Sequence, residues 1–347
     1  MPKARAPATL LSTGSANVRA ARRPGEPMHP FRFLAVVPTV LDATRLAQLG
    51  RRAESSGYSG VVVPDHLLDQ PAPIPTLAAI AAATDRLRIG TLVLNNDLRH
   101  PIVLAHELAT LDIISGGRLD IGLGAGWNVA EYSPVGLQFD PISTRVERLT
   151  ETLVILKGCF ADAPFSYSGS HFTIAGYDAR PKPIQRPHPP LLIAGGGRRT
   201  LELAAREADI VGLAPRLLSG RHGDPRSLTL EATAEKIDWV RRVAGDRFAA
   251  LELNVYPSTL TPSPLLSPIR ITDRPRVEAA RLVDWYRART GVALTEDEVI
   301  ESPHVFIGSI DGLVEKLRSL RERLGISSFM VGQVGQLGLV VERLAGT

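Results

Sequence analysis

Short apolar runs alternate with amphipathic helical stretches along residues 31–345, and this alternation constrains the fold more than any other feature of the chain. Such alternation is typical of βα units around a parallel sheet. The apolar runs lie at 31–37, 60–63, 88–94, 118–123, 190–194, 210–213, 250–256 and 327–331. The helical stretches lie at 42–56, 75–84, 101–115, 143–159, 198–208, 228–245, 273–290 and 310–324. The pattern therefore predicts an α/β chain folded as one (β/α)8 TIM barrel.

Three residues mark the expected ends of helices. Asp42 precedes the first helical stretch and can cap it, and Pro101 occupies the first position of the third. Gly57 follows the first helix, where a C′ glycine is expected. These signals support the helix boundaries on local grounds.

Three stretches do not fit a minimal barrel and are expected to be insertions after strands 4 to 7. Residues 161–189 alternate like a hairpin, and residues 214–227 and 257–272 are rich in Pro, Ser and Gly. Insertions in such barrels tend to shape the substrate pocket. The competing architecture, an open doubly wound sheet, needs a glycine-rich phosphate loop after the first strand, and Pro38-Thr39-Val40 stands there instead.

The formal net charge of +4 arises in residues 1–29, which hold five basic residues and one acidic residue. This segment lacks an apolar period, so we expect a disordered basic tail (1–29) before the catalytic domain (30–347). Met28 directly precedes the first strand and is a candidate second start of translation. Because the rest of the chain is near neutral, it offers no basic footprint for nucleic acid.

Cys159 is the single cysteine, so neither an intrachain disulfide nor a cysteine metal cluster is possible, and we expect no metal. No run of 18 apolar residues and no apolar signal segment occurs, which favours a cytoplasmic protein away from membranes. The chain has five lysines, all in the tail, in polar helical stretches or in Pro-rich loops. We expect none of them to be buried enough for a lowered pKa.

Two known motifs are each excluded by one residue that departs from the motif. His106-Glu107 begins like a zinc-protease helix, but Thr110 stands where the second histidine belongs. Gly122-Leu-Gly-Ala-Gly-Trp127 resembles a dinucleotide fingerprint, but Trp127 replaces its third glycine. The chain also lacks a nucleophile elbow and a Walker sequence.

Polar residues follow the second and third strands. Asp65 and His66 come directly after the second strand, where a carboxylate beside an imidazole can hold and titrate a proton. The structural alternative is a turn-capping Asp65 and a merely hydrogen-bonded His66. Residues 95–97 (Asn-Asn-Asp) end the third strand and suit either a turn or a ligand contact.

Glycines follow the fourth and fifth strands. The run 122–126 lets a planar ring approach the backbone, with Trp127 as a flat apolar wall, or it allows close packing of strand and helix. Gly195, Gly196 and Gly197 precede a helix, and exposed N–H groups with the positive helix end make a phosphate site. Arg198 and Arg199 either add charge there or face solvent.

These strand ends together resemble the bacterial luciferase-like superfamily, and within it the branch of oxidoreductases that use coenzyme F420, a deazaflavin. The resemblance covers the chain from Phe31 onward, and its motifs are specific in their joint order. The segments that carry it are Glu54–His66, Ile89–Asn95, Gly117–Trp127 and Pro190–Gly197.

The resemblance implies that His66 stabilises or relays a proton during hydride transfer, with Asp65 beside it. It also implies a bulge with a cis peptide between Leu92 and Val93, and a cofactor phosphate at Gly195 and Gly196. The cofactor-binding residues that it predicts are Asp65, Leu92, Val93, Asn95, Gly124, Ala125, Gly126, Trp127, Ala194, Gly195, Gly196 and Gly197.

The resemblance implies an F420-dependent oxidoreductase that transfers hydride to or from an organic metabolite at a C=C, C=N or alcohol/carbonyl centre. Sugar-phosphate dehydrogenases of this branch carry a catalytic glutamate where Trp127 stands, so that substrate is not expected. The alternatives are a monooxygenase that uses reduced FMN and a non-catalytic flavin-binding relative. The expected partner is a small-molecule substrate, and a homodimer, common in the family, stays open.

Overall fold

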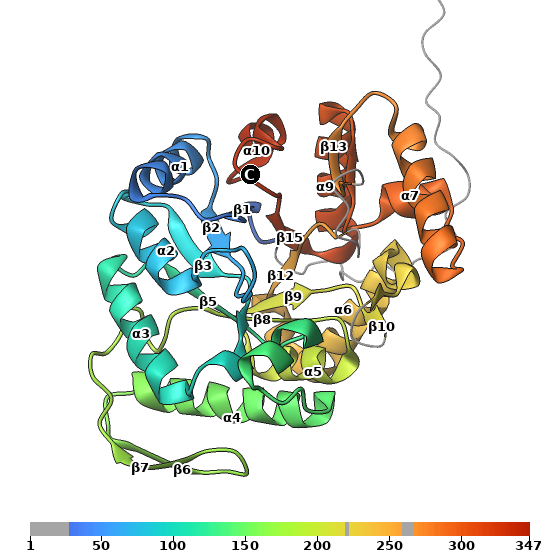
Figure 1. Cartoon of the computed structure of the whole chain (residues 1–347). Coiled ribbons are helices and arrows are strands. Elements are labelled where there is room, and N and C mark those ends of the chain that lie inside the picture. Colours follow the sequence, from blue (N-terminus) through green and yellow to red (C-terminus); the bar gives the residue numbers. More distant parts are fainter. Residues whose placement is uncertain (1–27, 219–221, 259–266) are drawn as a thin grey trace, which may run out of the picture.

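The computed structural model describes residues 28–218, 222–258 and 267–347. Within these residues, parallel strands form a closed barrel surrounded by helices (Figure 1). In order around the barrel the strands are β1 (Arg32–Val36), β2 (Gly60–Val63), β3 (Arg88–Thr91) with β4 (Leu94–Asn95), β5 (Leu119–Gly124), β8 (Leu191–Gly195), β9 (Ile210–Leu213), β12 (Glu252–Val255) and β15 (Ile326–Met330). The pairing of β1 with both β2 and β15 closes the circle and confirms the predicted (β/α)8 barrel.

Helices pack around the outside of the strands, as Figure 1 shows. They are α1 (Ala43–Ser55), α2 (Pro73–Ala81), α3 (Pro101–Ile114), α4 (Ile142–Phe160), α5 (Arg198–Glu207), α6 (Leu230–Ala244), α9 (Ile310–Leu324) and α10 (Gly338–Leu344). The predicted caps are confirmed: Asp42 accepts a hydrogen bond from the Arg45 N–H, Pro101 begins α3, and Gly57 has a φ of +79°. The sequence did not predict α10, a seven-residue helix.

The third apolar run, predicted as one strand over 88–94, is divided into β3 and β4. A cis peptide joins Leu92 to Val93 between the two pieces, at the position that the family resemblance implies. Both pieces pair with β5, so together they fill one position of the barrel. The strand is therefore interrupted close to its carboxyl end.

Charged side chains meet near the amino-terminal ends of several barrel strands. Arg32 on β1 donates to Asp120 on β5 at 2.7 Å and to Glu252 on β12 at 2.8 Å. Arg88 on β3 donates to Asp120 as well. These side chains are largely buried, so their mutual pairing offsets the cost of removing them from water. These ion pairs therefore lie at the end of the barrel opposite to the carboxyl ends of the strands.

The predicted hairpin within 161–189 is confirmed as β6 (Phe165–Ser168) and β7 (Thr173–Tyr177). It follows α4, so it is connected to the amino-terminal end of β8 and runs along the outside of α4 (Figure 1). The buried carboxylate of Glu151 on α4 holds the hairpin tip by accepting from the backbone N–H groups of residues 170–172.

A larger insertion lies between β12 and α9. It contains β13 (Ile269–Ile271), α7 (Pro275–Thr290), α8 (Glu296–Glu301) and β14 (Phe306–Gly308), with β13 parallel to β14. Its apolar side chains, among them Leu282 and Tyr286, form a hydrophobic cluster separate from the main core. The helix predicted at 273–290 thus belongs to this insertion. The shorter insertion after β9 contributes β10 (Leu217–Leu218), β11 (His222–Gly223) and η4 (Pro225–Leu228).

Parts of the sequence predictions fall on residues that the structure leaves undescribed. The expected tail (1–29) lies outside the described residues except for Met28 and His29, as do 219–221 and 259–266 of the expected insertions. Among the residues that are described, none of the helices is long and apolar enough to cross a membrane.

Candidate active site

The predicted site residues come together at the carboxyl-terminal end of the barrel. Asp65 and His66 follow β2, Asn95 ends β4, and Trp127 follows β5. Gly195 ends β8, and Gly196 and Gly197 follow it. Because all barrel strands are parallel, the segments that follow them share one face, which is the usual location of the active site in this fold.

His66 forms a hydrogen-bonded pair with Glu131. Its Nδ1 lies 2.8 Å from Oε1 of Glu131, whose side chain is 2% exposed. Glu131 also accepts from the Leu67 N–H at 3.1 Å and from the side-chain amide of Asn128. A carboxylate with these donors accepts the Nδ1 proton of the imidazole, which leaves Nε2 available for exchange with a substrate.

Sequence reasoning missed Glu131, although it lies only four residues beyond Trp127. It belongs to the single turn η2 (Val129–Glu131), and no motif marks it. The one available signal was an acidic residue in the loop after the glycine-rich strand. Position 127, where the resemblance implies a carboxylate for sugar-phosphate substrates, is Trp127, and Glu131 brings a carboxylate to the same loop.

Trp127 packs against His66 in a T-shaped contact. The two rings lie 5.5 Å apart at an angle of 84°, and Trp127 remains 46% exposed. An exposed tryptophan that contacts a titratable histidine forms an apolar wall beside it. The structure thus places Trp127 beside His66, and its role as a flat wall for a planar ring stays a prediction.

Asp65 has partners of its own and does not pair with His66. Both of its carboxylate oxygens accept from Arg99, at 2.6 and 3.2 Å, and one also accepts from the Asn95 N–H at 3.0 Å. Asp65 is 5% exposed. The carboxylate therefore holds the end of β4 in place. Its counter-charge comes from Arg99, which no sequence motif marks.

The glycines of β5 make room for the irregular third strand. A Cβ at Gly122 would overlap the carbonyl oxygen of Thr91, and one at Gly124 would lie 2.7 Å from the Val93 side chain. Leu92 and Val93 are only partly buried. The glycines therefore allow β5 to pack closely against the neighbouring third strand, whereas the sequence interpretation named packing against a helix. The approach of a planar ring stays a prediction.

A polar network supports the loop after β5 from the outside. The Tyr132 hydroxyl donates to Asn95 Oδ1 and to Asp97 Oδ2, each at 3.1 Å. Arg148 forms ion pairs with both Asp97 and Asp140. Burial and the nearby Asp97 raise the pKa of Tyr132 to about 12. Tyr132 therefore acts here as a neutral hydrogen-bond donor. The side-chain oxygen of Asn95 is directed to this network.

The triple glycine opens onto the amino-terminal end of α5. Gly197 is the cap residue of α5, offers no side-chain cap, and has no atom within 4 Å of the place where its Cβ would lie. A Cβ at Gly196, in contrast, would overlap the carbonyl of Pro215. The first N–H groups of a helix without a cap bind anions well. Arg198 pairs with Glu202 and is exposed, so it points along the helix surface.

The expectation that no lysine is buried is wrong. Lys236 on α6 is 1% exposed, and its Nζ donates to the carbonyls of Ala214 at 2.8 Å and Ser227 at 3.0 Å. Burial, with a smaller contribution from Arg216, lowers the pKa of Lys236 to about 7. The burial of Lys236 could not be predicted from the polar sequence of the helix, because tertiary packing decides which face of a helix is covered.

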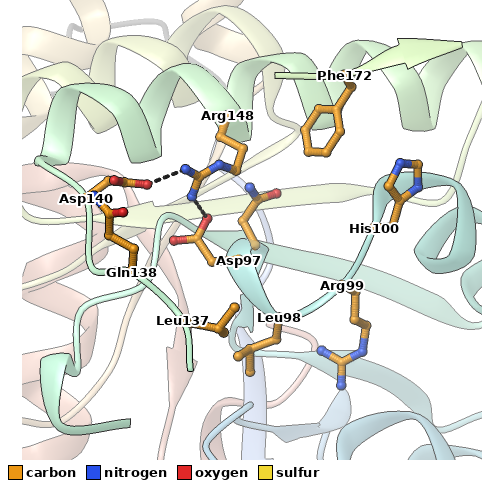
Figure 2. Close-up of a pocket in the computed structure, with 10 residues that line it drawn as sticks. Asp97, Leu98, Arg99, His100, Leu137, Gln138, Asp140, Arg148 and Phe172 are labelled. Atoms are coloured by element: carbon orange, nitrogen blue, oxygen red, sulfur yellow. Dashed lines mark hydrogen bonds and ion pairs between the residues drawn. The ribbon is translucent and has the colours of Figure 1, made fainter. Parts of the chain in front are cut away.

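A separate cavity of about 390 Å³ lies between η1 (Asn96–Leu98), α4 and the hairpin tip (Figure 2). Figure 2 shows Arg148 directed at Asp97 and Asp140 on one side and the rings of His100 and Phe172 on another. None of the predicted site residues lines this cavity. Arg99 connects it with the barrel end, because this residue lines the cavity and binds Asp65.

Curated proteins are similar to part of this chain. The chain is 33% identical over 168 residues to an F420-dependent glucose-6-phosphate dehydrogenase of Beutenbergia cavernae, covering 45% of this chain and 48% of that protein. It is 32% identical over 131 residues to an FMNH2-dependent dimethylsulfone monooxygenase of Pseudomonas putida, covering 38% and 36%. The matches thus span between a third and a half of these relatives.

Solved structures share the fold. The coenzyme F420-dependent tetrahydromethanopterin reductase of Methanopyrus kandleri superposes with a TM-score of 0.69 at 21% identity, covering 90% of this chain and 98% of that one. The profile of the luciferase-like monooxygenase family matches residues 18–220, more than half of the chain. The protein is therefore a member of the luciferase-like monooxygenase family, whose relatives are oxidoreductases that use a flavin-type cofactor.

Proposed function

We propose that the protein is an oxidoreductase that uses coenzyme F420 to transfer hydride to or from an organic metabolite. The observation that carries the proposal is the hydrogen-bonded pair of His66 and Glu131 beside Trp127, at the end of the barrel where the predicted cofactor residues meet. A mere binding protein gains little from a buried carboxylate that orients a histidine.

The triple glycine fits a cofactor phosphate. The space beside Gly197 is open and the first turn of α5 lacks a side-chain cap, so several backbone N–H groups are free to bind an anion. The ring would be held near Leu92, Val93, Asn95 and Trp127. When bound, the cofactor supplies the hydride-carrying centre, which none of the protein side chains provides.

His66 is proposed to hold and transfer the proton that accompanies hydride transfer. With Nδ1–H donated to Glu131, the neutral ring presents the Nε2 lone pair as a base, and the protonated ring presents Nε2–H as an acid. The Glu131 carboxylate stabilises the protonated ring in the same manner as the acid of a catalytic triad. Asp65 is proposed as a positioning residue, because Arg99 and the Asn95 N–H occupy its oxygens.

The rim of the barrel end favours an apolar substrate. Val40, Leu67, Leu68 and Trp127, which follow β1, β2 and β5, are 63, 51, 57 and 46% exposed. Exposed apolar side chains in one region are typical of binding surfaces. We therefore propose a substrate that is mainly apolar and reacts at a C=C, C=N or alcohol/carbonyl centre.

A second candidate is a monooxygenase that uses reduced FMN. The dimethylsulfone monooxygenase relative supports it, and the phosphate site described above suits FMN equally. A deazaflavin does not form the stable adduct with oxygen that monooxygenation needs, so the identity of the cofactor separates the two candidates.

The deciding experiment titrates the purified protein with coenzyme F420 and with FMN, each oxidised and reduced, and follows fluorescence. We expect F420 to bind more tightly and to be reduced or oxidised in the presence of an accepted substrate. A His66→Gln variant should bind the cofactor like the parent but turn over much more slowly. Binding of neither cofactor, or full turnover by the variant, would overturn the proposal.

A further inference from the structure

Lys236 lies directly behind the proposed phosphate loop. The carbonyl oxygen of Ala214 accepts from Lys236 Nζ at 2.8 Å, and the same oxygen lies 3.0 Å from the place where a Cβ of Gly196 would be. Placed end to end, these distances put the lysine nitrogen within about 6 Å of that point. The Ala214 N–H in turn donates to the carbonyl of Gly195 at 3.0 Å.

Lys236 forms no ion pair with a carboxylate among the described residues. Among the residues that the structure describes, its hydrogen-bond partners are two backbone carbonyls, those of Ala214 and Ser227. The charged groups that influence it are Arg216 after β9, Asp224 before η4 and Glu235 on α6, and Lys236 in turn acts on His304 before β14. A buried ammonium without a carboxylate in contact is stabilised by any anion that binds nearby.

We propose that Lys236 is the buried counter-charge of the phosphate loop at residues 195–197, and that it takes up a proton when a cofactor phosphate binds there. The inference rests on the proposed function. It adds a residue that touches no ligand and acts through the Ala214 carbonyl and through its charge. The positive end of α5 and the Lys236 ammonium both favour an anion bound at this loop.

The expected size follows from the separation. Two unit charges of opposite sign about 9 Å apart, at an effective dielectric constant of about 20, attract each other strongly enough to change a binding constant by about 20-fold. The pKa of Lys236, lowered to about 7 in the free protein, should rise by a little over one unit in the complex. The lysine should therefore tighten phosphate binding by about tenfold near pH 6.5 and have little effect at pH 9.

The experiment compares FMN with riboflavin, which differ only in the phosphate, and, as a second pair, coenzyme F420 with the deazaflavin core that lacks the phosphate and the groups attached beyond it. Affinities are measured by fluorescence at pH 6.5 and pH 9. Proton uptake is measured by calorimetry at pH 8 in buffers of different ionisation enthalpy. The parent should take up about half a proton with the phosphate-bearing ligand and none with its phosphate-free partner.

Two variants separate charge from structure. Lys236→Met removes both the charge and the donor, whereas Lys236→Gln keeps a donor without the charge. Both should lose about tenfold in affinity for the phosphate-bearing ligand at pH 6.5, keep the affinity for the phosphate-free one, and show no proton uptake. Lys316→Met is the matched control, because Lys316 also donates to two backbone carbonyls, those of Ile300 and Val305 in the insertion.

The outcomes are distinguishable. If the parent binds none of the four ligands, the proposed function fails and the inference fails with it. If the parent binds the phosphate-bearing ligands but Lys236→Met and Lys236→Gln bind them equally well, only the inference is overturned. Restoration of phosphate preference by Lys236→Gln would show that Lys236 is a structural donor and would likewise overturn the inference.

Discussion

Oε1 of Glu131 lies 2.8 Å from Nδ1 of His66, and the two residues are 65 positions apart in the sequence. The contact joins the loop after β2 to the loop after β5. It therefore depends on the order of the strands, because β2 and β5 both pair with β3 and no local structure could bring these loops together.

Replacement of Glu131 by Gln should reduce kcat with a smaller change in KM. The variant keeps the shape of the side chain but loses the negative charge that stabilises the protonated imidazole. Loss of one charge-assisted hydrogen bond of this kind corresponds to about 10- to 100-fold in kcat. Steady-state kinetics with an accepted substrate measure it. Glu207→Gln, which alters a carboxylate paired with Lys157 at the end of α5, is the control. Equal kcat in parent and Glu131→Gln would contradict the assigned role.

Arg99 and Asp65 should show strong coupling in a double-mutant cycle. Arg99→Met leaves the Asp65 carboxylate, 5% exposed, without its charge partner and should lower the free energy of unfolding by about 2 to 3 kcal/mol. Adding Asp65→Asn should recover part of that loss. Urea unfolding of the four proteins measures the coupling. The exposed pair of Arg198 and Glu202 on α5 serves as reference, with about 0.5 kcal/mol or less expected. Additive losses at Arg99 and Asp65 would contradict the prediction.

The fold could be predicted from the sequence because its signals are local. Strand 60–63 is buried on both faces and made of glycine and valines, and its predicted ends agree with β2. Asp42 and Pro101 mark helix starts through the backbone groups next to them. The cis peptide at Leu92 and Val93 was different, because only the resemblance to a family pointed to it.

The partners of the site residues could not be predicted in the same way. Asp65 and His66 are neighbours in sequence, but their side chains bind Arg99 and Glu131, which lie 34 and 65 positions away. Such pairings are decided by how loops pack after the barrel closes. Lys236 illustrates the same limit, since a lysine in a polar helix is buried only because a loop from β9 covers it.

Two glycine-to-alanine variants should differ sharply in stability. In Gly122→Ala the new Cβ meets the carbonyl oxygen of Thr91. This is a backbone atom, so it cannot move aside as the end of a flexible side chain could. We expect a loss of about 3 kcal/mol in the free energy of unfolding. In Gly197→Ala the Cβ enters open space at a φ of −99°, so stability should change by less than about 0.5 kcal/mol. Urea denaturation checks both, and equal losses would contradict the packing account.

Lys316 should make the protein more stable as the pH rises from about 7 toward 10. Burial lowers the pKa of Lys316 to about 7 from its usual 10.5, although Glu301 acts in the opposite direction. Between these two values the unfolded chain binds a proton at this site that the folded chain does not bind. The free energy of unfolding therefore increases with pH across this window, by at most about 1.4 kcal/mol per pH unit for one lysine.

The test compares the parent with Lys316→Met in urea at pH 6.5, 8 and 9.5. The variant loses hydrogen bonds to two carbonyls, so its absolute stability also changes, and the informative quantity is the slope against pH. We expect a smaller slope in Lys316→Met. Lys157→Met is the control, because it removes a lysine that pairs with Glu207 near the surface. Parallel curves for the parent and Lys316→Met would mean that Lys316 keeps its charge in the folded protein, and that the insertion admits enough water to solvate it.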